Sequence, residues 1–259
     1  MAEKLRSLLT FPDVSDGEIL QNSFNNVMNI LLNKALLRAG ENRYRFCELE
    51  LYFKDNTNHK DTFTHGTATQ LEHCKWYFHT RGGVYRGGTY KGLDLALGDA
   101  FRHVGILIRS IQNMEDQALF CGPCLCVNEI LRATENESIE NFVSNFGIDV
   151  FENEKLKIIS NENLVQRTIY KTPRVGLSLR TKNTVATKWW RRCYRWLSVS
   201  FLPKHRHLLV VSLRDQFSEI TEKEIIKLTG TTRVSARKYL EAYEKGKASG
   251  DPRSLMVKN

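Results

Sequence analysis

The sequence of 259 residues lacks several features that define common protein classes. No stretch approaches 18 consecutive apolar residues, so no membrane-spanning helix is predicted. Only 16 residues are glycine and no heptad repeat persists, which excludes collagen-like and coiled-coil chains. The first residues have neither the apolar run nor the small-residue cleavage site of a secretory signal. We therefore expect six reduced cysteines and a protein of the nucleus or cytoplasm, without membrane contact.

Acidic residues are missing from one long segment of the chain. Residues 164–214 hold twelve Lys and Arg but no Asp or Glu, whereas the whole chain has 38 basic and 29 acidic residues. The remaining 26 basic residues are therefore outnumbered by 29 acidic ones, and the formal charge of +9 comes entirely from this segment. Charge concentrated in this way is typical of a surface that binds phosphates, although a solvated basic face is the simpler alternative.

Hydrophobic periodicity predicts both helices and strands. Apolar residues at helical spacing predict a helix over 17–38, stopped by Gly40. Alternating residues predict a strand over 44–53, and the glycine pairs that follow Arg81 and Arg86 predict a hairpin or loop. Thr134 and Glu137 form a capping-box pattern for a helix. The further predicted elements are strands over 75–79, 104–110, 174–180 and 207–213 and helices over 124–134 and 135–145.

The fold class that follows is α+β. We expect a single domain with a mixed, largely antiparallel sheet, surface helices, and helical appendages at both ends. The expected parts are a helical segment 1–42, a central domain 43–213 and a C-terminal appendage 214–259. The appendage shows two short helices around Gly230, and these resemble half of a helix-turn-helix or two helices of a ubiquitin-associated module. Because no third helix is evident, a plain helical appendage is the leading interpretation.

The strand over 44–53 carries the most informative side chains. Glu48, Glu50 and Tyr52 would share one face, where buried carboxylates would be costly without a purpose. An exposed strand face is the alternative. Arg109 lies inside another apolar strand and needs a carboxylate partner, for which the 48–52 strand is the obvious source. Such a pair is either purely structural or a hydrolytic site in which the carboxylate is a base and the Arg orients water.

Metal and nucleotide motifs are weak or missing. Cys121, Cys124 and Cys126 suggest zinc, but the second pair of ligands is not present. No phosphate-binding loop with Gly-Lys-Ser or Gly-Lys-Thr occurs. We therefore expect neither a metal nor a cofactor.

The order of these features resembles the alkyladenine (3-methyladenine) DNA glycosylase family over about residues 44–200. CELELYF is similar to the family strand that carries a catalytic Glu two residues before a pocket Tyr, with a His after it near a glycine turn; here these are Glu50, Tyr52 and His65. GILIRSI resembles the strand whose Arg helps to hold the attacking water, here Arg109. CGPCLCVNEIL is similar to a helix start of the family, and PRVGLSL with WWRRCYRW resembles its closing strands and basic aromatic ending.

The resemblance implies a metal-independent N-glycosylase that hydrolyses the glycosidic bond of a modified purine in nucleic acid, as in DNA base-excision repair. Glu50 would deprotonate the attacking water while Arg109 fixes it, and the target base would be flipped out of the stack. A monomer that acts on DNA rather than RNA is expected. The base-pocket residues would be Tyr52, His65, Tyr90 and Asp94, and the nucleic-acid-binding residues would be Tyr85, Arg86, Lys91, Lys188, Arg191, Arg192 and Arg195.

Two positions depart from the family pattern. Asp94 stands where the family has a pocket Asn, and an Asp lacks the amide donor. Gly87 stands where the family has a wedge Tyr that fills the gap left by the flipped base. The loop with Tyr85 and Tyr90 suits sequence-tolerant stacking on single strands. The alternatives are therefore a catalytically inert nucleic-acid-binding protein on the same fold, or a glycosidase that acts on RNA or a free nucleoside.

Overall fold

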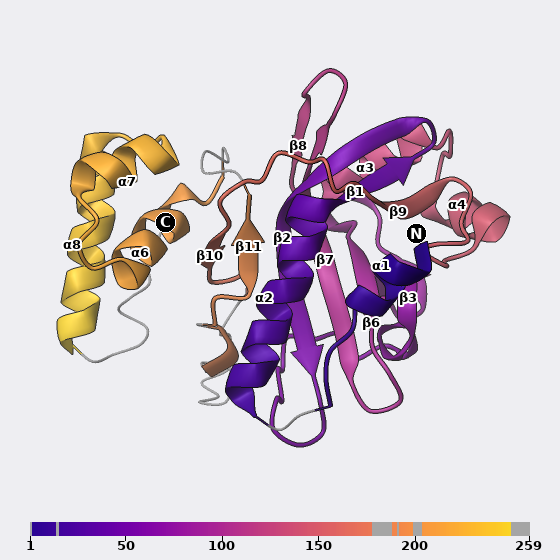
Figure 1. Ribbon diagram of the computed structural model, residues 1–259, viewed down its shortest axis with the longest axis horizontal. Helices are drawn as coiled ribbons and strands as arrows, with labels where there is room; N and C mark the ends of the chain where they lie inside the picture. The colour runs from indigo at the N-terminus through magenta and orange to yellow at the C-terminus, as the bar shows by residue number, and fades with distance from the viewer. Residues whose placement is uncertain (1, 14–15, 178–187, 191, 199–203, 250–259) are drawn as a thin grey trace. The chain divides into compact units, whose positions relative to one another are not determined.

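The computed structural model describes residues 2–13, 16–177, 188–190, 192–198 and 204–249 (Figure 1). The chain divides into two compact units, Met1–Arg167 and Thr168–Asn259. The fold is α+β with a mostly antiparallel sheet, which confirms the predicted class. The unit boundary differs from the expected ones after residues 42 and 213. The N-terminal helices pack on the sheet, and a helix spans residue 213.

The first unit is built on an antiparallel sheet in which β2 and β7 are the long central strands. Within this unit the strand order is β9-β1-β2-β7-β6-β3, and β8 extends the end of β7 by pairing with it. Every one of these pairings is antiparallel. The strands are β1 (Ala35–Ala39), β2 (Asn42–Lys54), β3 (His73–Phe78), β6 (Leu93–Leu97), β7 (His103–Asn113), β8 (Leu119–Cys121) and β9 (Leu156–Ser160).

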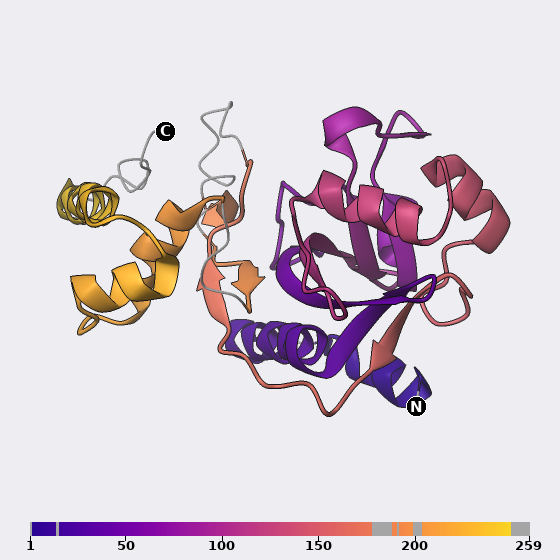
Figure 2. The ribbon, with the colours of Figure 1, turned by 90° about the horizontal axis from the view of Figure 1, so that it is seen from above.

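Helices cover both faces of this sheet (Figure 2). Helices α1 (Ala2–Leu8) and α2 (Gly17–Lys34) lie on one face, and α3 (Pro123–Ala133) lies on the opposite face. The buried face of α2 places Phe24 against Phe53 of β2, with ring centroids 5.1 Å apart. Helix α4 (Ile139–Phe146) packs through Phe142 on Phe78 of β3. One face of the sheet is therefore an apolar core under α2.

Several predicted boundaries were wrong, for local reasons. The predicted helix over 17–38 ends at Lys34, because residues Ala35–Ala39 pair with both β2 and β9 and gain two ladders of hydrogen bonds. Thr134 does not cap the next helix; it ends α3, and Ser138 caps α4. The predicted strand over 207–213 is helical. The predicted strand over 174–180 is not a strand at its described residues 174–177, and the rest of it lies outside the described residues.

The glycine-rich segment forms the predicted hairpin. Strands β4 (Thr80–Arg81) and β5 (Val84–Tyr85) pair across Gly82 and Gly83, both of which have positive φ, as a two-residue turn of this kind requires. Two short 3₁₀ helices lie nearby, η1 (Ala68–Leu71) and η2 (Gly88–Tyr90).

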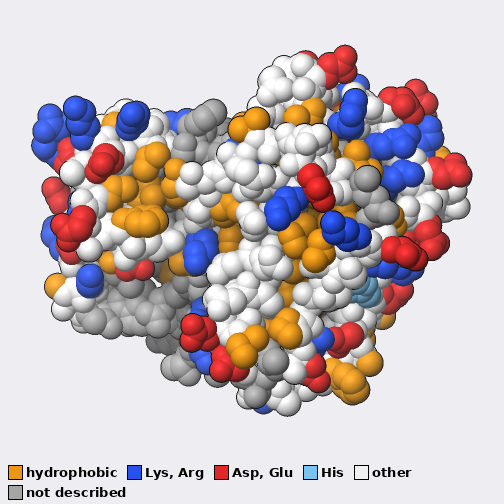
Figure 3. Space-filling view, in the orientation of Figure 1, with side chains coloured by type: hydrophobic (Ala, Val, Ile, Leu, Met, Phe, Trp, Pro, Cys, Tyr) orange, Lys and Arg blue, Asp and Glu red, His pale blue; other side chains and the backbone are white. Residues whose placement is uncertain are grey.

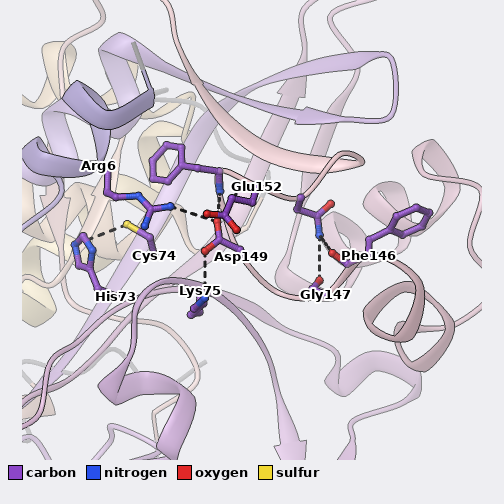
Figure 4. Close-up of polar contacts among 10 residues, drawn as sticks. Arg6, His73, Cys74, Lys75, Phe146, Gly147, Asp149 and Glu152 are labelled. Carbon is purple, nitrogen blue, oxygen red and sulfur yellow. Dashed lines mark hydrogen bonds and ion pairs between the residues drawn. The ribbon is translucent and has the colours of Figure 1, made fainter.

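The loop after α4 is tied to β3 and to α1 through one carboxylate (Figure 4). Asp149 lies 3.1 Å from the Lys75 ammonium and 3.5 Å from the Arg6 guanidinium, and it accepts backbone N–H bonds from Phe151 and Glu152. Burial alone would raise the pKa of Asp149, but these hydrogen bonds and Lys75 outweigh it and hold the pKa below its usual value. The cluster thus fixes an edge of the sheet.

The second unit contains two paired strands and a group of helices. Strand β10 (Tyr170–Thr172) pairs antiparallel with β11 (Arg195–Leu197). Helices α6 (Arg206–Gln216), α7 (Glu222–Thr229) and α8 (Arg233–Ser249) pack on one another. Thr221 and Glu224 form a capping box at the start of α7. Among the described residues of both units, no helix is long and apolar enough to cross a membrane.

Gly40 provides a test of how tightly the β1–β2 turn packs. Its φ is +56°, and an added Cβ would overlap the carbonyl oxygen of Ala133 at the end of α3. We expect Gly40→Ala to lower the free energy of unfolding by about 2–4 kcal/mol, since backbone strain and overpacking add. Urea unfolding followed by circular dichroism measures this loss.

The matched control is Gly82→Ala. Gly82 has a similar φ of +59° but no atom within 4 Å of an added Cβ, so only the strain of about 1 kcal/mol remains. Equal losses for the two variants would contradict the packing of the turn on α3.

Candidate active site

The register of four strands places a row of side chains on one face of the sheet. Glu50 on β2 pairs with Leu107 on β7, Leu107 pairs with Asp94 on β6, and Asp94 pairs with Tyr77 on β3. Paired residues point to the same face, and neighbouring strands lie about 4.8 Å apart. The backbones of Glu50 and Asp94 are therefore separated by about 10 Å, with Leu107 as an apolar floor between them.

Arg109 joins two carboxylates at one end of this row. Its Nε lies 2.8 Å from Glu48 Oε1 and 3.4 Å from Glu50 Oε1, and its Nη1 lies 3.4 Å from Glu50 Oε2. The side chains of Glu48 and Arg109 are 6% and 11% exposed, and that of Glu50 is 0% exposed. Burial alone would lower the pKa of Arg109, but Glu50 and Glu48 outweigh it and hold the pKa above its ordinary value. The guanidinium therefore stays charged.

Two hydroxyl groups complete this cluster. Tyr52 donates to Glu50 Oε2 at 3.0 Å, and Ser110 donates to Glu48 Oε2 at 2.6 Å. The β2–β7 register shifts on either side of Glu48, so that Glu48 faces Ser110 while Arg109 lies between the two carboxylates. The irregular register thus aims both carboxylates at one cation, which is typical of strand irregularities next to functional sites.

A second polar cluster lies around Asp94. His79 Nε2 is 2.7 Å from Asp94 Oδ1, and Gln70 donates to Asp94 Oδ2 at 3.3 Å. His65 Nδ1 is 3.1 Å from the Tyr77 hydroxyl, and the His65 and His79 rings are 4.6 Å apart. His65 as a residue is exposed, yet its ring packs on these neighbours; burial, followed by the charge of His79, lowers its pKa. The neutral imidazole is thereby favoured.

Gly105 connects the two clusters. It lies opposite Tyr52 on β2, and an added Cβ would overlap the Asp94 carboxylate and come within 2.6 Å of the Gln70 amide nitrogen. The missing side chain thus makes room over the sheet for the Asp94 and Gln70 side chains.

Four of the predicted catalytic and pocket residues share this face. Glu50, Tyr52 and Arg109 are in contact, and Asp94 lies two strands away in the same row. His65 reaches the row through Tyr77 and His79. Tyr90 is not brought to it by any described contact, since it stands 74% exposed on η2.

Sequence reasoning missed other members of the site. Tyr77 and His79 alternate on the predicted strand over 75–79, so a shared face could have been inferred from their spacing. Glu48 is predicted to share a face with Glu50 and Tyr52 and, as a carboxylate of the 48–52 strand, to be a candidate partner of Arg109, which it contacts. Ser110 and Gln70 gave no signal, because nothing in their local sequence marks them.

The predicted nucleic-acid-binding residues lie in different surroundings. Tyr85 is half-buried on Phe78, Arg86 donates to the Thr80 carbonyl and Lys91 donates to Asn128. Lys188 and Arg192 are exposed, and both lie over the ring of Trp189. Arg195 is only 1% exposed and donates to Thr172, so in this conformation it offers no surface to a phosphate. Arg191 lies outside the described residues.

The cysteines do not gather into a metal-binding group. Cys124 donates to the Gly88 carbonyl, and Cys126 is buried and donates to the Phe120 carbonyl. In the part of the chain that the structure describes, no three His, Cys, Asp or Glu residues are grouped to hold a metal ion.

Comparison with known proteins identifies one family relationship. The chain is 34% identical over 186 residues to "Uncharacterized protein L759" of Acanthamoeba polyphaga mimivirus, and the match covers 66% of this chain and 85% of the viral protein. The chain therefore belongs to the same family as this mimivirus protein. No protein-family model matches the chain.

The Arg109 ion pairs give a prediction for stability. Arg109→Met removes the cation that Glu48 and Glu50 both contact, and we expect a loss of about 3–5 kcal/mol at pH 7.5. Urea unfolding at this pH measures the loss.

The control is Arg38→Met. Arg38 also pairs with a carboxylate, Glu41, but the two side chains are 36% and 94% exposed, so we expect a loss of about 1 kcal/mol or less. If Arg109→Met cost no more than the control, the Arg109 cluster would not be a buried charge site.

Proposed function

We propose that the protein is an N-glycosylase that hydrolyses the glycosidic bond of a modified purine in nucleic acid. The observation that carries this proposal is the position of Glu50. Its carboxylate lies between Arg109 and Tyr52 on a sheet face that also presents Asp94 and His79. A base, an orienting cation and a set of rings for a purine are thus within reach of one bound nucleoside.

The chemistry needs few groups. Glu50 takes a proton from a water molecule, the water oxygen forms a bond to C1′ of the sugar, and the C1′–N bond breaks with its electron pair going to the purine. Arg109 holds the water and contacts the Glu50 carboxylate. Because Glu50 has no exposed surface, Tyr52 or a neighbouring side chain must move when the substrate enters. Tyr52 is half-buried and is the nearest candidate.

The purine would lie over Leu107 and Gly105, between Tyr52 and the rings of His65 and His79. A flipped base is held by stacking and by hydrogen bonds to its edge. Asp94 holds His79 and Gln70 in place, and a carboxylate there accepts hydrogen bonds but cannot donate them when ionised. We therefore expect a preference among modified purines that differs from that of glycosylases with an Asn at the position of Asp94.

The exposed segment around η2 bears on which nucleic acid is the substrate. Gly87 is exposed and has no side chain to fill a duplex, whereas Tyr90 next to it is open for stacking. DNA remains the first choice, in the nucleus or cytoplasm and with a monomeric enzyme. A single-stranded region or RNA is the second choice, because neither needs a wedge.

The test is base release by the Glu50→Gln variant. Oligonucleotides that carry alkylated or deaminated purines, as DNA duplex, DNA single strand and RNA, are incubated with the protein, and the free base is measured by mass spectrometry. We expect the wild type to release at least one base, and Glu50→Gln to be slower by about 10²–10⁴-fold with unchanged oligonucleotide binding.

A matched control is Glu41→Gln, which changes a carboxylate that is 94% exposed in the β1–β2 turn and should leave the rate unchanged. Release by Glu50→Gln at the wild-type rate would overturn the role of Glu50. If the wild type releases no base from any of the three polymers or from free nucleosides, the glycosylase proposal fails. The protein would then be interpreted as a catalytically inert nucleic-acid-binding protein.

A further inference from the structure

Helices α6, α7 and α8 of the second unit have the arrangement of a helix-turn-helix. Helix α7 has eight residues and is C-capped by Gly230, whose φ is +62°; the 17-residue α8 follows after a three-residue turn. A short turn that contains Gly between two crossing helices defines this motif. Helix α6 is the third helix that the sequence alone did not show.

The packing of the unit supports this arrangement. In Figures 1 and 2, α7 lies across the end of α8 at which α8 begins, and α6 contacts both helices. Ile225 of α7 and Ala236 of α8 are fully buried, and Tyr243 of α8 donates to Asp215 of α6 at 2.5 Å. The inner faces of the helices are therefore fixed, and the outer face of α8 is left open.

The open face at the start of α8 is basic. Arg233, Val234, Arg237 and Lys238 are exposed, with Val234 80% exposed, and α8 as a whole has five Lys or Arg against two Glu. Figure 3 shows Lys and Arg side chains gathered where α7 meets α8. A recognition helix reads the major groove through the residues of its N-terminal turns. Arg can pair with guanine there, and an apolar side chain such as Val234 can contact the methyl group of thymine.

Two of these cations have partners that are easily exchanged. Arg233 and Arg237 each lie 3.1 Å from Glu222 at the start of α7, but their side chains are 70% and 52% exposed. Ion pairs at a surface contribute little to stability, so a DNA phosphate or base edge can compete for them. In the absence of DNA, Glu222 holds the Arg233 and Arg237 side chains over the start of α8.

A cavity of about 300 Å³ lies beside the same end of α8. Arg206, His205, Thr231, Thr232 and Ser235 are among its lining residues. Thr232 also caps α8, since its hydroxyl accepts the Ser235 N–H. Basic and hydroxyl side chains beside a recognition helix are the groups that usually contact the DNA backbone and set the register of the protein.

We propose that helices α6, α7 and α8 of the second unit form a helix-turn-helix module that binds duplex DNA, with α8 as its recognition helix. This goes beyond the proposed glycosidic site, which lies in the other unit, and does not depend on it. The competing feature is an apolar groove between α6 and α7 that includes Phe217, Ile220 and Leu228. That groove has acidic Glu219 and Glu224 at its rim and would suit a protein, whereas the charge on α8 favours DNA.

The experiment uses the full chain with the Glu50→Gln change, so that no substrate is cleaved. Random undamaged DNA duplexes are selected for binding, and the affinity for the selected sequence is measured by fluorescence anisotropy at several salt concentrations. We expect selection of a short preferred sequence. Arg237→Ala with Lys238→Ala should weaken binding to it by about tenfold, abolish the preference and lower the salt slope by about 1–2.

The control double variant, Lys245→Ala with Lys247→Ala, removes the same charge from the far end of α8 and should weaken binding by less than about threefold. Circular dichroism and the thermal midpoint verify that both double variants fold. The proposal is overturned if no sequence is enriched, or if the two double variants bind alike. The proposal is also overturned if DNA binding is changed by Phe217→Ser and by neither double variant. The apolar groove between α6 and α7 would then be the functional surface. These outcomes do not depend on whether the wild type releases a base, so a failure of the proposed glycosylase function would leave this test unaffected.

Discussion

The ion pairs of Arg109 with Glu48 and Glu50 are the constraint on which the first unit depends. A guanidinium that is 11% exposed between two strands is tolerable only if its carboxylate partners remain in reach. A slip of one residue between β2 and β7 would turn these charges toward the apolar face under α2, where Phe24 and Phe53 pack. The charges therefore fix the register, and the register places Asp94 and Tyr77 in the same row across the sheet as Glu50.

The polar face has two ends. The Arg109 end is buried and lies under α3, where the buried Cys126 thiol has a pKa raised well above its usual value by burial and by Glu48. At the Asp94 end His65 is exposed, although Asp94 and Gln70 are buried. In the proposed function, Glu50 would therefore react at the closed end, and a purine would enter past His65.

The central strands and their charges could be predicted from the sequence, because alternation shows which side chains share a face. Alternation predicts the shared face of Glu48, Glu50 and Tyr52, and the need of Arg109 for a carboxylate partner from that strand is confirmed by its contacts with Glu48 and Glu50. Residues 35–39 and 207–213 could not be predicted, since their apolar patterns fit helix or strand equally and tertiary pairing decides. Ser110 and Gln70 join the site only through the register, which no local pattern contains.

The most direct measurement of the central claim is a crystal structure of the Glu50→Gln chain with an oligonucleotide that carries a modified purine. We expect a purine flipped out between Tyr52 and His65, with C1′ facing residue 50 and a water held by Arg109. A complex in which residue 50 stays covered by protein and the purine binds elsewhere would contradict the proposed role of Glu50.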